Sequence, residues 1–520
     1  MMKFINLFLL LLGSLNCANI QAQKITSAED VHDTVHAYRA LNERKIIEDF
    51  VELLSLPNVA DNLPNISRNA DHIIQLLESR GFSTERLTAG GAPYIFAELQ
   101  GNENNETILI YAHYDGQPVI EENWKYLPFT PTVLDAALDN DGQPVDWQSG
   151  EQTIDPEWRL YGRSASDDKM PIIALIHALD ALNANGIPLS VNLKLLLDGE
   201  EEKGSPTVGQ ILQNHGDLLG SDLLLFCDGP MHQSRRLQLV FGVRGDTGVD
   251  ITAYGATRPL HSGHYGNWAP NPIMQLSYLL TTMRDETGHI SIDGYYDDVI
   301  PLSNLERTAI FEMPALDEHL KHELSVHTPE GDGMRLEELI TLPAINARGF
   351  IAGGVAEKGR NIIVSTATVS LDLRLVPEQT PKQARSLIES HIVDQGFFVV
   401  HEEPTPELLR TQGKIVKLDW RGGYPAYRTA IDHPVAQHLK NILTVVAPDL
   451  LLTPTMGGSL PLYEFGARLT APIIILPLAN HDNNQHAENE NIRLANVWDA
   501  IAIYAIILAT YGNPQLALLR

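Results

Sequence analysis

Four short apolar runs in the chain each end in side chains that can bind metal ions. They are residues 108–112 before His113-Tyr114-Asp115, residues 193–197 before Asp198-Gly199-Glu200-Glu201-Glu202, residues 223–227 before Asp228, and residues 473–478 before the segment that contains His486. Such runs are typical of buried strands in a parallel sheet, and sites form beyond the carboxyl ends of these strands. The four runs together predict one site for two metal ions. Spacing does not decide whether His481 or His486 is the late ligand.

Glu200, Glu201 and Glu202 form a run of three acids after the second apolar run. Three adjacent carboxylates repel one another unless cations or solvent separate them. In a metal site, one carboxylate can bind an ion while its neighbour accepts a proton from metal-bound water. A solvated acidic loop would show the same sequence, so the triplet indicates catalysis only together with the other runs.

Asp167 and Asp168 are adjacent carboxylates that precede an apolar helical pattern at residues 172–179. An Asp at this position can cap the helix. That role suits Asp168 and leaves Asp167 free to face the crevice, where its two oxygens can bridge two cations. His113 and Asp115 fit a metal ligand whose ring is oriented by a carboxylate, although a hydrogen-bonded structural histidine would look the same.

The composition describes an ordinary globular protein with an acidic surface. The chain has 520 residues, which is too many for one compact core, and 44% of them are hydrophobic. Its 37 Lys and Arg against 66 Asp and Glu give a formal charge of −29. Such a surface repels phosphate backbones and anionic lipids, so we expect no nucleic-acid partner and no membrane partner.

The N-terminus carries the pattern of an export signal. A short basic start precedes an apolar stretch at residues 4–12, and small or polar residues follow up to Ala22. The stretch is too short to span a bilayer and predicts a signal peptide over residues 1–22, with a lipoprotein anchor at Cys17 less favoured. After cleavage only Cys227 remains, so the mature chain cannot form an internal disulfide, which fits a periplasmic location.

The order of the patterns predicts an α/β catalytic domain that is interrupted by a smaller domain. Apolar runs and helical patterns alternate to about residue 242, as in a parallel sheet built from βαβ units. Residues 244–412 instead combine alternating strands, two helices and an irregular stretch, which is typical of an α+β domain. The α/β pattern then returns, so we assign residues 23–243 and 413–520 to the catalytic domain.

Taken in order, these segments resemble a family of metallopeptidases, the dizinc enzymes of the carnosinase and cytosolic nonspecific dipeptidase type. That family belongs to a larger group with glutamate carboxypeptidases and acetylornithine deacetylase. The matching motifs are His113-Tyr114-Asp115, residues 162–169, Glu201-Glu202-Lys203-Gly204-Ser205, Asp228-Gly229, Leu260-His261-Ser262-Gly263, Leu373-Arg374-Leu375-Val376-Pro377, Gly457-Gly458-Ser459-Leu460-Pro461 and His486-Ala487-Glu488-Asn489-Glu490. The resemblance implies a zinc-exopeptidase-like catalytic domain with a mainly parallel sheet, interrupted by an α+β lid and dimerisation domain.

By this resemblance, five residues hold two divalent metal ions. They are His113 and Asp228 for one ion, Glu202 and His486 for the other, and Asp167 as the bridge between both. The resemblance therefore favours His486 over His481. Zinc is the expected metal, with manganese or cobalt as alternatives, and each ion keeps an open position for water. In the family, the peptide bond equivalent to Asp167–Asp168 is cis.

The resemblance also implies roles in catalysis and in substrate binding. Glu201 is expected to act as the general base, and Asp115 to orient His113. His261 is expected to stabilise the oxyanion, often in the partner subunit's site of a homodimer. The expected substrate contacts are Arg374, which would bind a free carboxylate, and Asn361, Gly458 and Ser459.

The sequence thus predicts a periplasmic dizinc exopeptidase that cleaves dipeptides or short peptides with a free C-terminal carboxylate. The two metals would lower the pKa of a bridging water, and Glu201 would accept its proton. An N-acyl-amino-acid deacylase with the same metal site is the first alternative. A non-catalytic periplasmic receptor is the second, but a receptor has no need of Glu201. A glycosidase would leave His113, His261 and His486 without a role.

Overall fold

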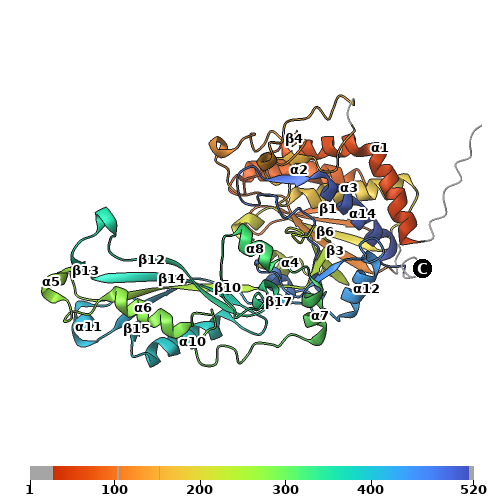
Figure 1. Cartoon of the computed structure of the whole chain (residues 1–520). Coiled ribbons are helices and arrows are strands. Elements are labelled where there is room, and N and C mark those ends of the chain that lie inside the picture. Colours follow the sequence, from red (N-terminus) through yellow and green to blue (C-terminus); the bar gives the residue numbers. More distant parts are fainter. Residues whose placement is uncertain (1–26, 102–104, 151–152, 514–520) are drawn as a thin grey trace, which may run out of the picture.

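The computed structural model describes residues 27–101, 105–150 and 153–513, so the predicted signal peptide and Cys17 lie outside the described residues. Figure 1 shows an α/β body built from both ends of the chain and an elongated arm built from its middle. Among the helices of the described part, none is both long and apolar enough to cross a bilayer.

The α/β body contains an eight-stranded sheet. Its strands are β1 (Ser83–Leu87), β2 (Tyr94–Leu99), β3 (Thr107–His113), β6 (Asn192–Asp198), β7 (Leu223–Phe226), β8 (Gln238–Val240), β18 (Leu451–Thr453) and β19 (Ile473–Ile475). Their spatial order is β1-β2-β6-β3-β7-β19-β8-β18. The central strands β6, β3, β7 and β19 are parallel, whereas β2 and β8 pair antiparallel with their inner neighbours. The predicted α/β fold is confirmed, with a mixed sheet around a parallel centre.

Helices cover both faces of this sheet. They are α1 (Ala28–Leu54), α2 (Leu63–Glu78), α3 (Lys169–Ala184), α4 (Val208–His215), α12 (Pro434–Leu443), α13 (Leu462–Gly466) and α14 (Leu494–Thr510). Alternate residues of β3 point to opposite faces: Ile108 and Ile110 join the core with α1, α3 and α14, whereas Leu109 and Tyr111 pack with α4 and α13. A strand buried on both faces explains the unbroken apolar run in the sequence.

The arm contains a five-stranded sheet in the order β12-β14-β10-β16-β15. Its elements are β10 (Gly245–Tyr254), α6 (Pro272–Met283), β12 (Ala344–Ile351), β14 (Thr366–Leu375), α10 (Pro381–Asp394), β15 (Phe398–Val400) and β16 (Ile415–Trp420). The helices α6 and α10 pack on one face, against Val249, Ile251 and Leu371 among others. Within the described residues, α6 and α10 are the long helices of this apolar cluster, and the opposite face of β10 and β14 carries the polar residues that alternate with the apolar ones.

Shorter elements complete the described chain. They are β4 (Thr132–Leu134), β5 (Arg159–Tyr161), β9 (Gly242–Val243), β11 (Leu260–His261), α5 (Ser262–Tyr265), α7 (Asn304–Glu312), α8 (Asp317–Glu323), α9 (Leu336–Leu339), β13 (Ile362–Ile363), α11 (Pro406–Thr411), β17 (Tyr427–Arg428) and β20 (Asn491–Arg493). The helices α7, α8 and α9 occupy the stretch that sequence patterns left irregular. Glu306 of α7 contacts Arg428 at 3.5 Å, which links this stretch to the α/β body.

The structure moves two boundaries away from their predicted positions. The strand β16 pairs with β10 in the arm, so the return to the α/β body follows Trp420 and not residue 412. The segment before β16 is polar and includes α11, so the sequence pattern does not indicate that the arm continues to this last strand. The apolar pattern of the sequence predicts a helix over residues 68–80. Helix α2 begins five residues earlier, at Leu63, because Asn62 caps it by accepting a hydrogen bond from the Asn65 N–H.

Candidate metal centre

The carboxyl ends of the four central strands place the predicted ligands at one edge of the sheet. His113 is the last residue of β3, and Asp228 follows β7 by two residues. Glu201 and Glu202 lie in a single helical turn directly after β6. His486 belongs to the segment between β19 and β20. Parallel neighbours end at the same edge, so residues far apart in the sequence converge there.

The first group of possible ligands consists of His113, Asp167 and Asp228, all of them buried. The Nε2 atom of His113 lies 2.8 Å from Asp167 Oδ1 and 4.0 Å from Asp228 Oδ2. These ligand atoms all lie within 4.8 Å of one another, which is compatible with a single ion between them.

The second group consists of Asp167, Glu202 and His486, and it shares Asp167 with the first. The Nε2 atom of His486 lies 3.1 Å from Asp167 Oδ2 and 3.2 Å from Glu202 Oε2. The structure brings His486, and not His481, to these carboxylates. Asp167 presents one oxygen to each histidine, which is the arrangement expected of a bridging carboxylate.

The donor set fits two divalent metal ions. Each group offers one imidazole and two carboxylates, a combination that suits zinc, manganese or cobalt. Glu202 Oε1 is buried and accepts no hydrogen bond from the described residues, so this oxygen is available to a metal ion. Burial raises the pKa of Asp228 to about 7, and a bound cation would oppose this shift by favouring the ionised form.

The predicted base and its neighbour are held next to this set. Asp115 accepts hydrogen bonds from the backbone N–H of Glu201 at 3.1 Å and of Glu202 at 3.0 Å. Its Oδ1 also lies 3.2 Å from His113 Nδ1. One carboxylate therefore orients a histidine ligand and fixes the segment that carries the base. Burial raises the pKa of Glu201 well above its usual range.

The loop that carries Asp167 contains a cis peptide bond between Asp167 and Asp168, as the resemblance implied. Asp168 stands at the N-cap position of α3, but its side chain makes no capping hydrogen bond. Its Oδ2 instead accepts from the His113 N–H at 3.1 Å. Asp168 thus joins the loop to β3, and it belongs to neither group of possible metal ligands.

Glu490 is a structural support of the site that the sequence analysis did not identify. It is fully buried and accepts hydrogen bonds from the N–H groups of Ser164, Ser166 and Asp167, at 2.9, 2.9 and 3.0 Å. Arg163 pairs with it at 2.8 Å. Its position in the motif after His486 was the only signal. A carboxylate that binds three N–H groups of one loop fixes the direction of the Asp167 side chain.

Arg374 and Ser459 meet where the arm joins the α/β body. Arg374 donates to Ser459 Oγ at 3.0 Å and to Asp372 Oδ2 at 3.1 Å. Ser459 and Glu201 both line a cavity of about 230 Å³, together with Tyr424. The predicted base and one of the predicted substrate contacts, Ser459, thus border one small cavity. Gly458 precedes Ser459 in the chain. The Gly458 carbonyl accepts a hydrogen bond from the Arg244 N–H at 3.4 Å.

His261 and Asn361 lie elsewhere in the chain. Both are exposed, and the Ser262 N–H donates to the Asn361 carbonyl at 2.9 Å. They lie next to α5, at the end of the arm that is remote from the α/β body (Figure 1). The structure therefore does not bring these two residues to the metal-binding residues of their own chain.

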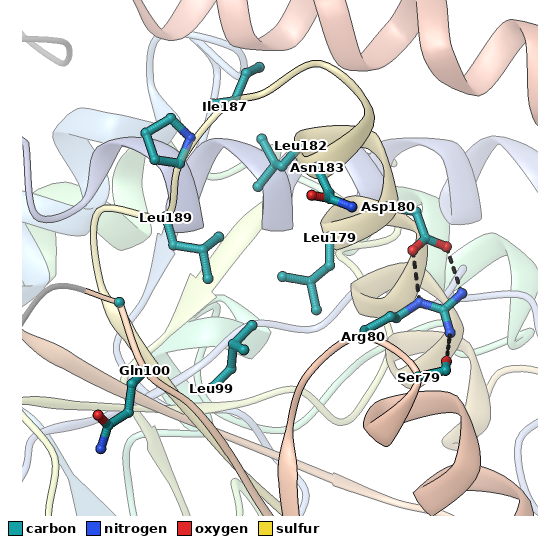
Figure 2. A pocket seen from close by; sticks show the side chains of 12 residues that line it. Ser79, Arg80, Leu99, Gln100, Leu179, Asp180, Leu182, Asn183, Ile187 and Leu189 are labelled. Carbon is teal, nitrogen blue, oxygen red and sulfur yellow. Dashed lines mark hydrogen bonds and ion pairs between the residues drawn. The ribbon is translucent and has the colours of Figure 1, made fainter.

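A separate cavity of about 510 Å³ contains none of the predicted site residues. Figure 2 shows its lining, in which apolar side chains such as Leu179 and Leu189 face the ion pair of Arg80 with Asp180. Arg80 donates to both oxygens of Asp180, at 2.8 and 2.6 Å. These charges satisfy each other, so this cavity offers no chemistry of its own.

Comparisons with known proteins agree with this geometry. The model of peptidase family M20/M25/M40 matches residues 109–510. The Cys-Gly metallodipeptidase of Schizosaccharomyces pombe is 24% identical over 497 residues, covering 90% of this chain and 96% of that protein. The Beta-Ala-His dipeptidase of Rattus norvegicus is 25% identical over 455 residues, covering 85% and 83%. The crystal structure of an M20 family metallo-carboxypeptidase from Sulfolobus solfataricus is 26% identical, with a TM-score of 0.69, covering 90% and 99%.

Proposed function

Because the chain belongs to peptidase family M20/M25/M40, we propose that it is a metal-dependent hydrolase that cleaves dipeptides with a free C-terminal carboxylate. The observation that carries this proposal is the pair of ligand groups that share Asp167, with Glu201 beside them. A protein that only binds metal or peptide would need no residue beyond the ligands. Hydrolysis also requires a general base, and a largely buried glutamate next to the ligands can supply it.

The residues divide the chemical work between them. Two bound divalent ions would polarise the scissile carbonyl and make water a stronger nucleophile at neutral pH. Glu201 accepts a proton and later delivers it to the leaving amine, and its raised pKa suits both steps. Asp115 keeps Glu201 in place through the N–H groups of residues 201 and 202.

A carboxylate anchor and the names of the relatives favour short substrates. Arg374 and Ser459 form the anchor for the free carboxylate, since an arginine binds this group with parallel hydrogen bonds. The relatives from Schizosaccharomyces pombe and Rattus norvegicus are both named as dipeptidases. These names and the proposed carboxylate anchor support dipeptides as the substrates.

We expect the purified protein to hydrolyse dipeptides and to lose activity to below about 1% when a chelator removes its metals. Zinc, manganese and cobalt are added back separately, and the ion that restores the rate identifies the preferred metal. The same assay compares dipeptides, their C-terminal amides and N-acetyl amino acids. Faster cleavage of N-acetyl amino acids than of any dipeptide would contradict the dipeptidase proposal and identify the protein as an N-acyl-amino-acid deacylase.

We also propose a homodimer formed through the arm. The strand β12 lies at the edge of its sheet and exposes Phe350 and Ile351, by 43% and 79%. Met274 and Tyr278 of α6 are exposed by 65% and 56%. An exposed edge strand with large apolar side chains is a common pairing surface. In such a dimer, His261 reaches the metal centre of the partner chain, which explains its place at the far end of the arm.

Mixing two inactive variants tests this arrangement. Glu201→Gln lacks the base and His261→Ala lacks the oxyanion contact, so each homodimer should be inactive. A mixed dimer contains one complete site if His261 acts across the interface, so the mixture should recover about a quarter of the wild-type rate. If His261 acted within its own chain, no mixed dimer would contain a complete site and the rate would stay at zero.

We further propose that the protein is exported to the periplasm, because residues 1–22 carry the pattern of a cleaved signal peptide. N-terminal sequencing of the mature protein should begin after Ala22, in the periplasmic fraction. An intact N-terminus in the cytoplasmic fraction would contradict export.

A further inference from the structure

Arg244 lies close to Arg374 where the arm begins. It stands between β9 and β10, two residues before Asp246, and Asp246 is directly paired with Arg374 across β10 and β14. The positive charge of Arg374 acts on the Arg244 guanidinium, so the two cations lie near each other. The Arg244 N–H donates to the Gly458 carbonyl at 3.4 Å, which places Arg244 at the loop that carries Ser459.

Ser459 connects the two arginines. Its hydroxyl accepts a hydrogen bond from the Arg374 guanidinium and donates one to the Arg244 carbonyl, both at 3.0 Å. Ser459 also lines the cavity that contains Glu201. The backbone of Arg244 is therefore fixed at the end of the proposed substrate site, next to the carboxylate anchor.

The Arg244 guanidinium has almost no partners of its own. Its only hydrogen bond within the described residues runs from Nη2 to the Leu342 carbonyl at 2.8 Å. Its Nε is buried and makes no hydrogen bond, and none of the described acids lies within 4.0 Å of it. Arg374, in contrast, contacts Asp372 at 3.1 Å and Asp246 at 3.9 Å. Burial and the charge of Arg374 lower the pKa of Arg244 to about 10.

A half-buried cation beside a second cation is an unfavourable arrangement unless an anion joins it. We propose that Arg244 is a second substrate-binding arginine, which shares the C-terminal carboxylate of the substrate with Arg374. This inference rests on the proposed function, because it assumes that Arg374 anchors that carboxylate. The carboxylate has two oxygens and four acceptor positions, so it can serve two guanidinium groups at once. Arg244 then contributes affinity for peptides with a free C-terminus and takes no part in the chemical step.

The test uses metal-loaded protein and two ligands, a dipeptide and its C-terminal amide. In the Glu201→Gln background, which is expected to turn the peptide over about 1,000-fold more slowly, titration calorimetry measures Kd before much peptide is cleaved. Adding Arg244→Gln should raise Kd for the free dipeptide by about 10- to 100-fold, the range expected for a lost charged hydrogen bond. Kd for the amide should stay the same. Arg244→Lys keeps the charge and should give an intermediate value.

Kinetics with Glu201 intact provide the second readout. Arg244→Gln should raise KM for the dipeptide and leave kcat within about 3-fold, as expected for binding that is lost equally in ground state and transition state. Arg86→Gln is the matched control, because Arg86 pairs with Asp71 on the surface of the α/β body. Thermal unfolding of all variants shows whether the junction of arm and body is intact.

Several results would overturn this inference. An equal loss of affinity for acid and amide would make Arg244 a support of the domain junction only. Unchanged affinity for both ligands would exclude any contact, and a loss confined to dipeptides that end in Asp or Glu would assign Arg244 to a side chain. The variant Arg374→Gln shows whether a negative result concerns Arg244 alone or the proposed function as a whole. If Arg374→Gln also fails to discriminate acid from amide, the carboxylate anchor itself is wrong.

Discussion

Glu201→Gln is expected to lower kcat by about 1,000-fold while the protein still binds close to two metal ions. Glu201 belongs to neither ligand group, so its amide should leave the five ligands in place. The glutamine has nearly the same size and keeps the N–H that Asp115 binds. Glutamine cannot accept a proton, so the activation free energy of the hydrolytic step rises by the contribution of general-base catalysis.

Two measurements on the same preparation check this expectation, the metal-to-protein ratio and the steady-state rate with a dipeptide. Glu200→Gln is the matched control, because Glu200 is the preceding acid and binds the N–H of Ala92 and of Thr207. Its substitution should lower stability and leave most of the activity. Full activity of Glu201→Gln would exclude Glu201 as the base, and loss of metal would make it a ligand.

Much of the fold and the metal centre could be predicted from the sequence, because the relevant signals are local. The runs before His113 and Asp228 are apolar throughout, since the central strands are buried on both faces. Such runs are easily recognised, and the residues that follow them must lie at the carboxyl edge of the sheet. The resemblance supplied what spacing could not, namely the preference for His486 over His481.

The supporting residues could not be predicted in the same way. Glu490 acts on Ser164 and Asp167, which are more than 300 positions away in the chain, and nothing in its immediate sequence reports those contacts. Arg244 is a single arginine between the strands β9 and β10, and its lack of an acidic partner among the described residues appears only when the arm is folded against the body. The end of the arm was placed at residue 412 because β16 is short and follows a polar segment.

Asp167→Asn is expected to remove both metal ions, whereas substitutions of the other ligands should remove mainly one. Asp167 is the one residue that belongs to both ligand groups of the described chain. Burial raises its pKa, but hydrogen bonds from His113 and His486 outweigh burial and hold the pKa far below its usual range. The site is therefore built around a carboxylate that stays charged, and an amide cannot supply two anionic oxygens.

The measurement is the metal-to-protein ratio after dialysis, with Asp228→Asn and His486→Ala as single-group comparisons. We expect fewer than about 0.3 ions per chain for Asp167→Asn and about one for each comparison, with kcat/KM lowered by at least about 1,000-fold in Asp167→Asn. Two retained ions in Asp167→Asn would show that the carboxylate is not shared.

Thermal unfolding distinguishes lost metal from a misfolded loop. A ligand that binds only the folded state raises Tm in proportion to its affinity, so added zinc should raise Tm of the wild-type protein clearly. The same addition should leave Tm of Asp167→Asn unchanged, while its metal-free Tm stays near that of the metal-free wild type. Glu490 holds the loop through backbone N–H groups, which the substitution keeps, so the loop should still form. A large fall of the metal-free Tm would mean that Asp167 stabilises the fold itself through His113 and His486.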